Sequence, residues 1–403
     1  MKPACLGPAV LLAALVLYPP SSRADAEIEF GLNNGYTNNL LSEASAQDDA
    51  YSTARLTARW YPLPQLQLSL GTDYTYYNNV IGLGNNTPRA GLIWVPTDPA
   101  GRLTFYLEGN TSARRYRAAY SSYSTNEGYL KGSVGFRLNP RFLLRSGIKF
   151  NGTNYITPDS TTDADYEQYE LFAGVNIALP WSNSFDLEAG LGQTNFALID
   201  AAKNPDFQNP YAAPGVQWPA TKFLEDGDFR ALYVSPRVSR PLGDKTGISL
   251  TYVYRQFLDV DEAVVLGITT DFLSPWTSFF DGSSLQLRIK SYVISDFILT
   301  GGLGYWDKTF LRSTEVVVDT IPTPRPDDPD RVRIETRWVD PKDATAREDD
   351  MTRLYFGLQR PFTFRGGLYL EPSLGLEYID NRSTRDNFDY STTAVTFNIL
   401  VRP

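Results

Sequence analysis

A stretch of alternating residues from Leu130 to Asn151 most constrains how this chain can fold. Side chains two apart share one face of a strand, so apolar residues such as Phe136 fall on one face and cations such as Arg137 on the other. Asn139-Pro140 marks a turn, after which the alternation resumes. Each arm is close to the roughly 9–11 residues with which a tilted strand crosses a bilayer. The stretch predicts a hairpin that would suit a transmembrane barrel or a soluble sandwich.

The beginning of the chain predicts export. Met1-Lys2 precedes an apolar run from Leu6 to Tyr18, and small residues follow up to Ala24. This is the pattern of a secretory signal peptide, which we expect to be residues 1–24, cleaved after Ala24 or Ala26. No composition break divides the 403 residues, so residues 25–403 are expected to form a single domain. After the N-terminal run, no apolar stretch is long enough for a membrane helix.

Residue usage excludes several function classes. There is no His, and the single Cys lies within the signal peptide, which removes disulfides, Ser-His-acid and Cys-His catalysis, and His-ligated metals. A formal charge of −9 argues against nucleic acid as a partner. We therefore expect a protein that is not an enzyme and that has no cofactor and no dedicated metal site.

Sixteen segments along the chain have the composition and alternation of strands. They are 27–36, 51–61, 66–77, 88–95, 102–116, 128–138, 142–155, 166–179, 184–199, 229–240, 246–257, 283–294, 297–310, 351–360, 367–378 and 389–401. Pro236 and Pro372 fall inside two of them, where each removes one ladder hydrogen bond; we expect β-bulges or strand ends there.

The lengths of the connections alternate. Every second one is short, as at 62–64 and 139–140, whereas those at 200–228, 259–282 and 313–350 are long, polar and irregular. Transmembrane barrels have short periplasmic turns and long extracellular loops, whereas soluble all-β folds have no reason to sort their loops in this way. The pattern predicts an all-β, antiparallel transmembrane barrel of about 16 strands, within roughly 14–18.

Aromatic residues gather at both ends of these segments, as bilayer interfaces favour. The predicted girdle beside the short turns is Trp60, Trp94, Phe142, Trp181 and Phe297. The predicted girdle beside the long loops is Tyr76, Tyr77, Tyr116, Tyr155, Tyr254, Tyr305 and Tyr378.

The polar alternates are expected to face a water-filled lumen. The predicted pore-lining residues are Arg55, Arg59, Arg114, Lys131, Arg137, Arg145, Lys149, Arg237, Arg288, Lys290, Arg353, Glu108 and Glu188. The densest cationic group is Lys131, Arg137, Arg145 and Lys149, and fixed cations in a narrow pore favour anions. The alternative is that these charges pair with acids such as Glu170 on neighbouring strands and only keep the lumen wet and rigid.

Two loops carry further hypotheses. The loop from Ser313 to Asp350 contains the acidic runs 327–330 and 348–350, which are either solvated or able to hold Ca²⁺. The loop from Asp200 to Asp228 mixes aromatic residues with Pro and Gly, and it would plug the pore, dock a partner or pack on other loops.

The pattern resembles Gram-negative outer-membrane β-barrel proteins over the whole mature chain. The start is more narrowly similar to β-barrel porins found with exopolysaccharide export systems, in Tyr36-Thr37-Asn38-Asn39, then Asp48-Asp49-Ala50-Tyr51, and then the strands up to Tyr76-Tyr77. The resemblance implies a location in the outer membrane, contact with its lipid, and a periplasmic or surface polysaccharide as a partner.

The leading hypothesis is a porin-like channel for polar, anionic solutes or polysaccharide. A second is a non-conducting scaffold whose long acidic loops bind a surface partner or polymer. A third is a hydrolase that uses carboxylates alone, for example Asp186 with Glu188, which share one strand face.

Overall fold

The computed structural model describes residues 25–40, 47–96, 101–156, 164–198, 227–260, 280–292, 296–310, 316–322, 332–338, 347–384 and 386–403. In this part of the chain, sixteen strands form one antiparallel barrel. They are β1 (Asp25–Thr37), β2 (Asp49–Leu63), β3 (Leu66–Tyr77), β4 (Asn85–Trp94), β5 (Leu103–Tyr116), β6 (Thr125–Asn139), β7 (Phe142–Tyr155), β8 (Ala164–Ala178), β9 (Ser184–Leu198), β10 (Gly227–Pro241), β11 (Thr246–Val260), β12 (Phe280–Ser291), β13 (Ile298–Phe310), β16 (Glu348–Gln359), β18 (Tyr369–Ser383) and β19 (Tyr390–Arg402).

The remaining elements are short. β17 (Phe362–Thr363) pairs with the start of β18. The 3₁₀ turns η1 (Ile81–Leu83), η2 (Ala118–Tyr123) and η5 (Asp386–Phe388) lie in the connections after β3, β5 and β18. Among the residues that the structure describes, no helix has the length and apolar character to cross a membrane.

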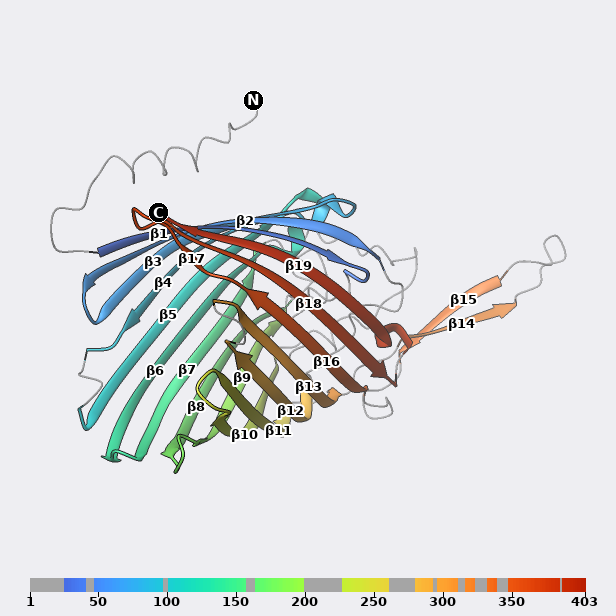
Figure 1. The fold of residues 1–403 in the computed structure, drawn as a ribbon. Coiled ribbons are helices and arrows are strands. Elements are labelled where there is room, and N and C mark those ends of the chain that lie inside the picture. Colours follow the sequence, from blue (N-terminus) through green and yellow to red (C-terminus); the bar gives the residue numbers. More distant parts are fainter. Residues whose placement is uncertain are drawn as a thin grey trace.

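The barrel closes because its first strand is paired on both sides (Figure 1). Phe30 of β1 lies opposite Leu56 of β2 and also opposite Val401 of β19. A closed sheet has no unpaired edge, which matters in hydrocarbon because each unpaired backbone group costs several kcal/mol. The predicted closed barrel of about sixteen strands is confirmed, and β7 has the predicted bounds.

Short turns and long connections lie at opposite ends of the barrel, and the start of β1 and the C-terminus share the short-turn end (Figure 1). The β6–β7 turn follows the predicted Asn139-Pro140 signal. The Asn139 side-chain oxygen accepts hydrogen bonds from the backbone N–H groups of Arg141 and Phe142 at 2.8 and 3.1 Å. Such a side-chain bond fixes a tight turn.

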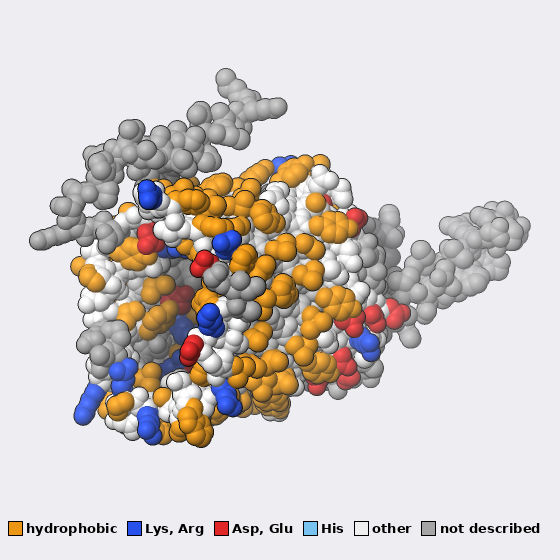
Figure 2. Space-filling model, viewed as in Figure 1, with side chains coloured by type: hydrophobic (Ala, Val, Ile, Leu, Met, Phe, Trp, Pro, Cys, Tyr) orange, Lys and Arg blue, Asp and Glu red, His pale blue; other side chains and the backbone are white. Residues whose placement is uncertain are grey.

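The outer wall of the barrel is apolar. Leu70 and Leu171 are each 63% exposed and Ile148 is 55% exposed. Figure 2 shows hydrophobic side chains covering the flank of the barrel, with charged side chains gathered towards both of its ends. An exposed apolar surface of this extent is stable only against lipid, so this wall faces the bilayer.

Some of the predicted girdle residues lie on the exposed face of the barrel, and others lie inside it. Trp60, Trp94, Trp181, Phe142, Tyr76, Tyr254, Tyr305 and Tyr378 have exposed side chains, and whether they meet the bilayer interface stays a prediction. Tyr116 and Tyr155 instead line a cavity inside the barrel, and Tyr77 packs on Tyr51, 5.9 Å between ring centroids. Their assignment to the outer girdle is wrong because strand alternation, not nearness to a loop, decides which face a side chain takes.

Prolines interrupt the ladder without shifting it. Pairing between β10 and β11 stops at Val234 and resumes at Arg237 in the same register, so the bulge or strand end expected at Pro236 is wrong. On the other side, Pro236 stays opposite Leu187. Pro372 lies inside β18, opposite Ile399 of β19 and without a register shift, so the bulge or strand end expected there is wrong as well. On its other side the ladder passes from β17, which pairs with Leu370, to β16, which pairs with Ser373.

The long connection after β13 contains structure that the sequence analysis treated as irregular. β14 (Val316–Pro322) and β15 (Val332–Trp338) pair in antiparallel register as a separate two-stranded sheet. Figure 1 draws this hairpin apart from the barrel ladder, at the long-loop end. Its first strand begins Val316-Val317-Val318, and β-branched residues favour extended backbone.

Candidate functional site: the barrel lumen

A cavity lined by strands from different sides of the barrel identifies the inner face of the wall. A cavity of about 660 Å³ is lined by side chains of β2–β8 together with Arg255 of β11. Strands so far apart in the ladder can border one cavity only inside the closed barrel. The polar lining is Thr57, Ser69, Arg89, Asn110, Thr111, Ser112, Arg114, Tyr116, Thr125, Glu127, Tyr129, Asn151, Thr153, Tyr155, Tyr166, Gln168 and Arg255. We call this space the β2–β8 cavity.

Cross-strand register extends this assignment round the barrel, because directly opposed residues share a face. One row runs through Asn176, Asp186, Arg237, Thr251, Gln286, Gly304 and Arg353. Alternation from such rows puts every predicted pore-lining residue on the inner face: Arg55, Arg59, Arg114, Lys131, Arg137, Arg145, Lys149, Arg237, Arg288, Lys290, Arg353, Glu108 and Glu188. That these residues border an open pore stays a prediction.

Lys149 is the centre of an ion-paired cluster on β7–β10. Its Nζ lies 2.6 Å from Oε1 of Glu170 on β8 and 3.0 Å from Oε1 of Glu188 on β9. It also donates to the hydroxyl of Tyr233 on β10 at 3.0 Å, and that hydroxyl is 2.8 Å from both carboxylates. Arg145 adds a second cation, 3.3 Å from Glu188. The cluster neutralises this part of the wall.

The densest cationic group expected from the sequence is therefore not a free cationic row. Lys149 is paired with Glu170 on the neighbouring strand, and Arg145 is paired with Glu188 one strand further on and lies 3.9 Å from Asp186. Lys131 lies over the ring of Phe172, with Nζ 5.4 Å from its centroid. For Arg145 and Lys149, the alternative interpretation of charges paired across strands is the one that the geometry supports.

Two glycines make room for the rings in this cluster. A Cβ added at Gly190 would lie 2.3 Å from Cε1 of Tyr233, and one added at Gly147 would lie 2.8 Å from Cζ of Phe172 and 2.1 Å from the backbone oxygen of Gly132. These distances are shorter than any van der Waals contact, so each ring occupies the space that a side chain would need. The glycines thus let Tyr233 and Phe172 lie against the wall.

We expect Gly190→Ala to destabilise the folded barrel by about 2 kcal/mol, the usual cost of overpacking a close contact. The added methyl group would displace Tyr233 from its two carboxylate partners. Gly247→Ala on β11 is the matched control, because no atom lies within 4 Å of its added Cβ. Urea unfolding in lipid vesicles measures both variants, and equal losses of stability would contradict the role of Gly190.

Other charges on the inner wall are also neutralised by charged side chains on adjacent strands. Glu29 of β1 accepts from Arg59 of β2 and from Arg402 of β19, each at 3.0 Å, which adds side-chain bonds at the seam where the barrel closes. Asp73 lies between Arg55 and Arg89 at 3.0 and 3.1 Å. A single carboxylate thus holds two cations at each of these places.

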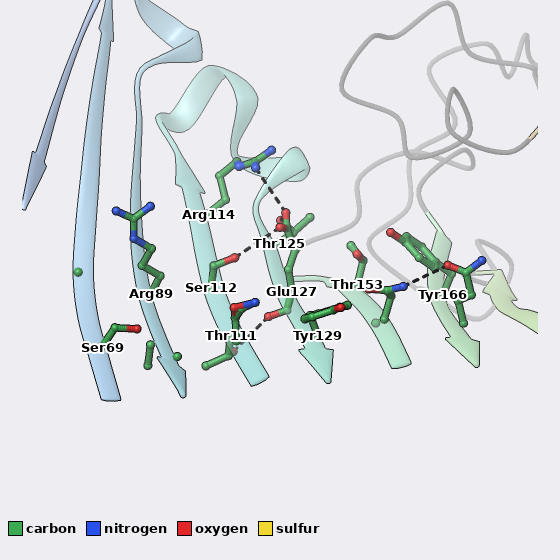
Figure 3. Close-up of a pocket in the computed structure, with 18 of the residues that line it drawn as sticks. Ser69, Arg89, Thr111, Ser112, Arg114, Thr125, Glu127, Tyr129, Thr153 and Tyr166 are labelled. Atoms are coloured by element: carbon green, nitrogen blue, oxygen red, sulfur yellow. Dashed lines mark hydrogen bonds and ion pairs between the residues drawn. The ribbon is translucent and has the colours of Figure 1, made fainter. Parts of the chain in front are cut away.

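The β2–β8 cavity is polar, with few charges (Figure 3). Glu127 is the one carboxylate among the described residues that line it, and three neighbours hold it: Arg114 at 3.7 Å, Ser112 at 3.4 Å and Thr125 at 3.1 Å. Hydroxyl, amide and phenol groups make up most of the rest of its polar lining. Such a lining hydrogen-bonds water or sugar-like solutes without binding one charge strongly.

Three cations on β10 and β12 differ from the ion-paired wall charges in having no carboxylate partner among the described residues. Arg237, Arg288 and Lys290 are exposed, and in the part of the chain that the structure describes none has a carboxylate within 4 Å. Arg237 lies opposite Asp186 in the ladder, but that carboxylate is engaged by Asn176 at 2.7 Å. We call these three residues the β10–β12 cations.

Sequence reasoning missed several inner-wall residues that matter to the geometry. Arg89 was not singled out, because the predicted strand began only one residue before it, at Pro88. Alternation could have put Arg89, Tyr233 and Arg402 on the inner face, since Arg89 alternates with Thr87 and Gly91 and Tyr233 shares a strand face with Arg237. The partners of Tyr233 and Arg402 could not be predicted, because only the closed barrel brings their strands together.

The loop hypotheses fall mostly outside the described residues. The signal peptide 1–24, most of the loop from Asp200 to Asp228, and the acidic run 327–330 all lie outside them. The run 348–350 is the start of β16, where alternation sends Asp349 to the opposite face from Glu348 and Asp350. Asp349 is paired with Arg347, so these three carboxylates do not converge on a common point.

The sequence matches no protein-family model and no curated protein. Solved structures with a similar fold include CdiB from Acinetobacter baumannii, 10% identical with a TM-score of 0.50, over 93% of this chain and 60% of that one. OpdK from Pseudomonas aeruginosa, solved with vanillate, is 12% identical over 94% and 99% with a TM-score of 0.44. A bacterial polysaccharide outer membrane secretin is 9% identical over 93% and 98% with a TM-score of 0.47. The closed sixteen-strand barrel with its apolar outer wall has the fold of an outer-membrane β-barrel protein.

Proposed function

We propose that the protein is an outer-membrane channel and that polar solutes cross the membrane through its lumen. The lumen lies between the wall formed by β2–β8 and the wall formed by β10–β13. The observation that carries this proposal is the 660 Å³ polar cavity inside the closed barrel, bordered by Arg255 from the far wall. Packing alone does not account for a polar cavity inside a lipid-facing barrel, because apolar side chains that filled the cavity would make the barrel more stable. Passage of water-soluble molecules is the function that such a space supports best.

We further propose that the channel favours anions. The support comes from the β10–β12 cations, which are exposed on the inner wall without a carboxylate partner in the described residues. Fixed positive charge in a narrow aqueous passage raises the local concentration of anions and lowers their barrier. The transported solutes are accordingly small polar anions or an acidic polysaccharide.

Planar-bilayer recording tests the channel. Purified, folded protein is expected to produce discrete current steps in KCl, whereas the same detergent without protein produces none. Folding is checked separately by heat-dependent gel mobility, so that absence of current can be assigned to a closed lumen. A folded, inserted barrel that carries no current would remove the channel proposal.

A second candidate is a surface scaffold, and the hairpin β14–β15 favours it. This hairpin belongs to the long-loop end and is not part of the barrel ladder. The proposed partner is a surface polymer, tested with polygalacturonate in the presence of Ca²⁺, because Ca²⁺ can bridge an acidic polymer to acidic loops. Retention of the polymer by the intact protein, and its loss when residues 316–338 are replaced by a short Gly-Ser linker, would support the scaffold.

A further inference from the structure

A second cavity lies on the opposite side of the lumen from the β2–β8 cavity. It has a volume of about 260 Å³ and lies on β12, β13 and β16. Its polar and aromatic lining is Arg288, Gln286, Trp306, Tyr355 and Arg353, and Leu287, Leu303 and Gly304 complete it. The sequence predicted that both arginines line the pore, but it did not predict that they lie beside two aromatic rings.

Two aromatic rings of this cavity lie over glycines of β13. A Cβ added at Gly304 would lie 2.3 Å from the Trp306 ring, and one added at Gly302 would lie 2.2 Å from Cε1 of Tyr355. Each ring therefore occupies the space above a glycine of β13. Large rings lying along a wall present a face to the lumen, and a ring face is a stacking surface.

Only one of the two arginines at this cavity has a carboxylate partner among the described residues. Arg353 is paired with Glu377 of β18. Arg288 has no carboxylate within 4 Å in the described residues, and its Nη2 donates to the side-chain oxygen of Gln286 at 3.1 Å. That bond orients the guanidinium and leaves its other N–H groups for a ligand, since a guanidinium has five donors.

We propose that this cavity is a solute subsite for a carboxylate carried on a six-membered ring, held by Arg288 through the carboxylate and by Trp306 and Tyr355 through the ring. Guanidinium and carboxylate form paired, charge-assisted hydrogen bonds, which is the strongest recognition available here. The volume admits one ring rather than a chain. The proposal rests on the proposed channel function, because it names the class of solute that the lumen selects.

Titration calorimetry in detergent tests the subsite without requiring conduction. Galacturonate is expected to bind at least about tenfold more tightly than galactose, and Arg288→Gln is expected to abolish that difference. Trp306→Leu should weaken galacturonate binding while leaving the preference over galactose in place. The control is Lys245→Gln, which removes an exposed cation from the β10–β11 turn, outside the cavity, and should leave the preference unchanged.

The outcomes separate the two proposals. Equal binding of galacturonate and galactose, or a preference that survives Arg288→Gln in a folded barrel, overturns the subsite whether or not the protein conducts. Selective binding by a barrel that carries no current overturns the channel and leaves the subsite standing. Benzoate distinguishes the kind of ring: tighter binding than galacturonate identifies an aromatic acid as the ligand class, and weaker binding identifies a sugar acid.

Discussion

Lys149→Met is expected to destabilise the folded barrel by about 3 kcal/mol, the lower part of the range for removing one partner from a buried ion pair. Methionine keeps the length and most of the volume of the side chain but leaves Glu170 and Glu188 facing each other without their shared cation. All three charged side chains are less than one-fifth exposed, so water screens the repulsion only in part. Tyr233, which lies within hydrogen-bonding distance of both carboxylates, cannot neutralise them.

Lys131→Met on the neighbouring strand is the matched control. Lys131 and Lys149 lie directly opposite each other in the β6–β7 ladder, but Lys131 contacts the ring of Phe172 and has no carboxylate within 4 Å in the described residues. We expect Lys131→Met to cost less than about 1 kcal/mol, as substitutions of unpaired, water-accessible charges do. Urea unfolding in vesicles compares the two. Equal costs would mean that the cluster on β7–β10 does not stabilise the barrel.

The architecture could be predicted from the sequence because a transmembrane barrel repeats one rule. Alternation assigns a face to each residue, and turn signals such as Asn139-Pro140 end each strand. The predicted bounds of 142–155 agree with β7 in full. Errors arose where a residue was assigned by its nearness to a loop: Tyr116 and Tyr155 were expected on the outer girdle but face the lumen.

Pairing between wall charges could not be predicted in the same way. Lys149 bonds to residues 39 and 84 positions away in the chain, and only the register of closed strands brings them together. The sequence therefore predicted which charges face inward, but it could not tell the cations held by carboxylates from the β10–β12 cations. The β14–β15 hairpin was missed for another reason, since a proline-rich, charged segment offers little alternation.

Neutralising the β10–β12 cations is expected to remove the anion preference of the channel. For the variant Arg237→Gln, Arg288→Gln, Lys290→Gln, we expect the permeability ratio of chloride to potassium to fall by about tenfold, the smaller end of the effect of a charged passage on local ion concentration. The reversal potential in a KCl gradient measures the ratio. The effect should shrink in concentrated salt, because screening acts within about 10 Å at 0.1 M.

The control must preserve net charge, because removing one member of an ion pair also exposes its partner. Neutralising Arg145 or Lys149 would lower anion preference simply by freeing Glu188, so that result would not identify which cations attract anions. Arg114→Gln with Glu127→Gln removes a pair separated by 3.7 Å and leaves the total charge unchanged. We expect this double variant to keep the permeability ratio of the parent protein. If both variants changed the ratio alike, selectivity would follow from the shape of the lumen, and unpaired positive charge on β10 and β12 would not be its cause.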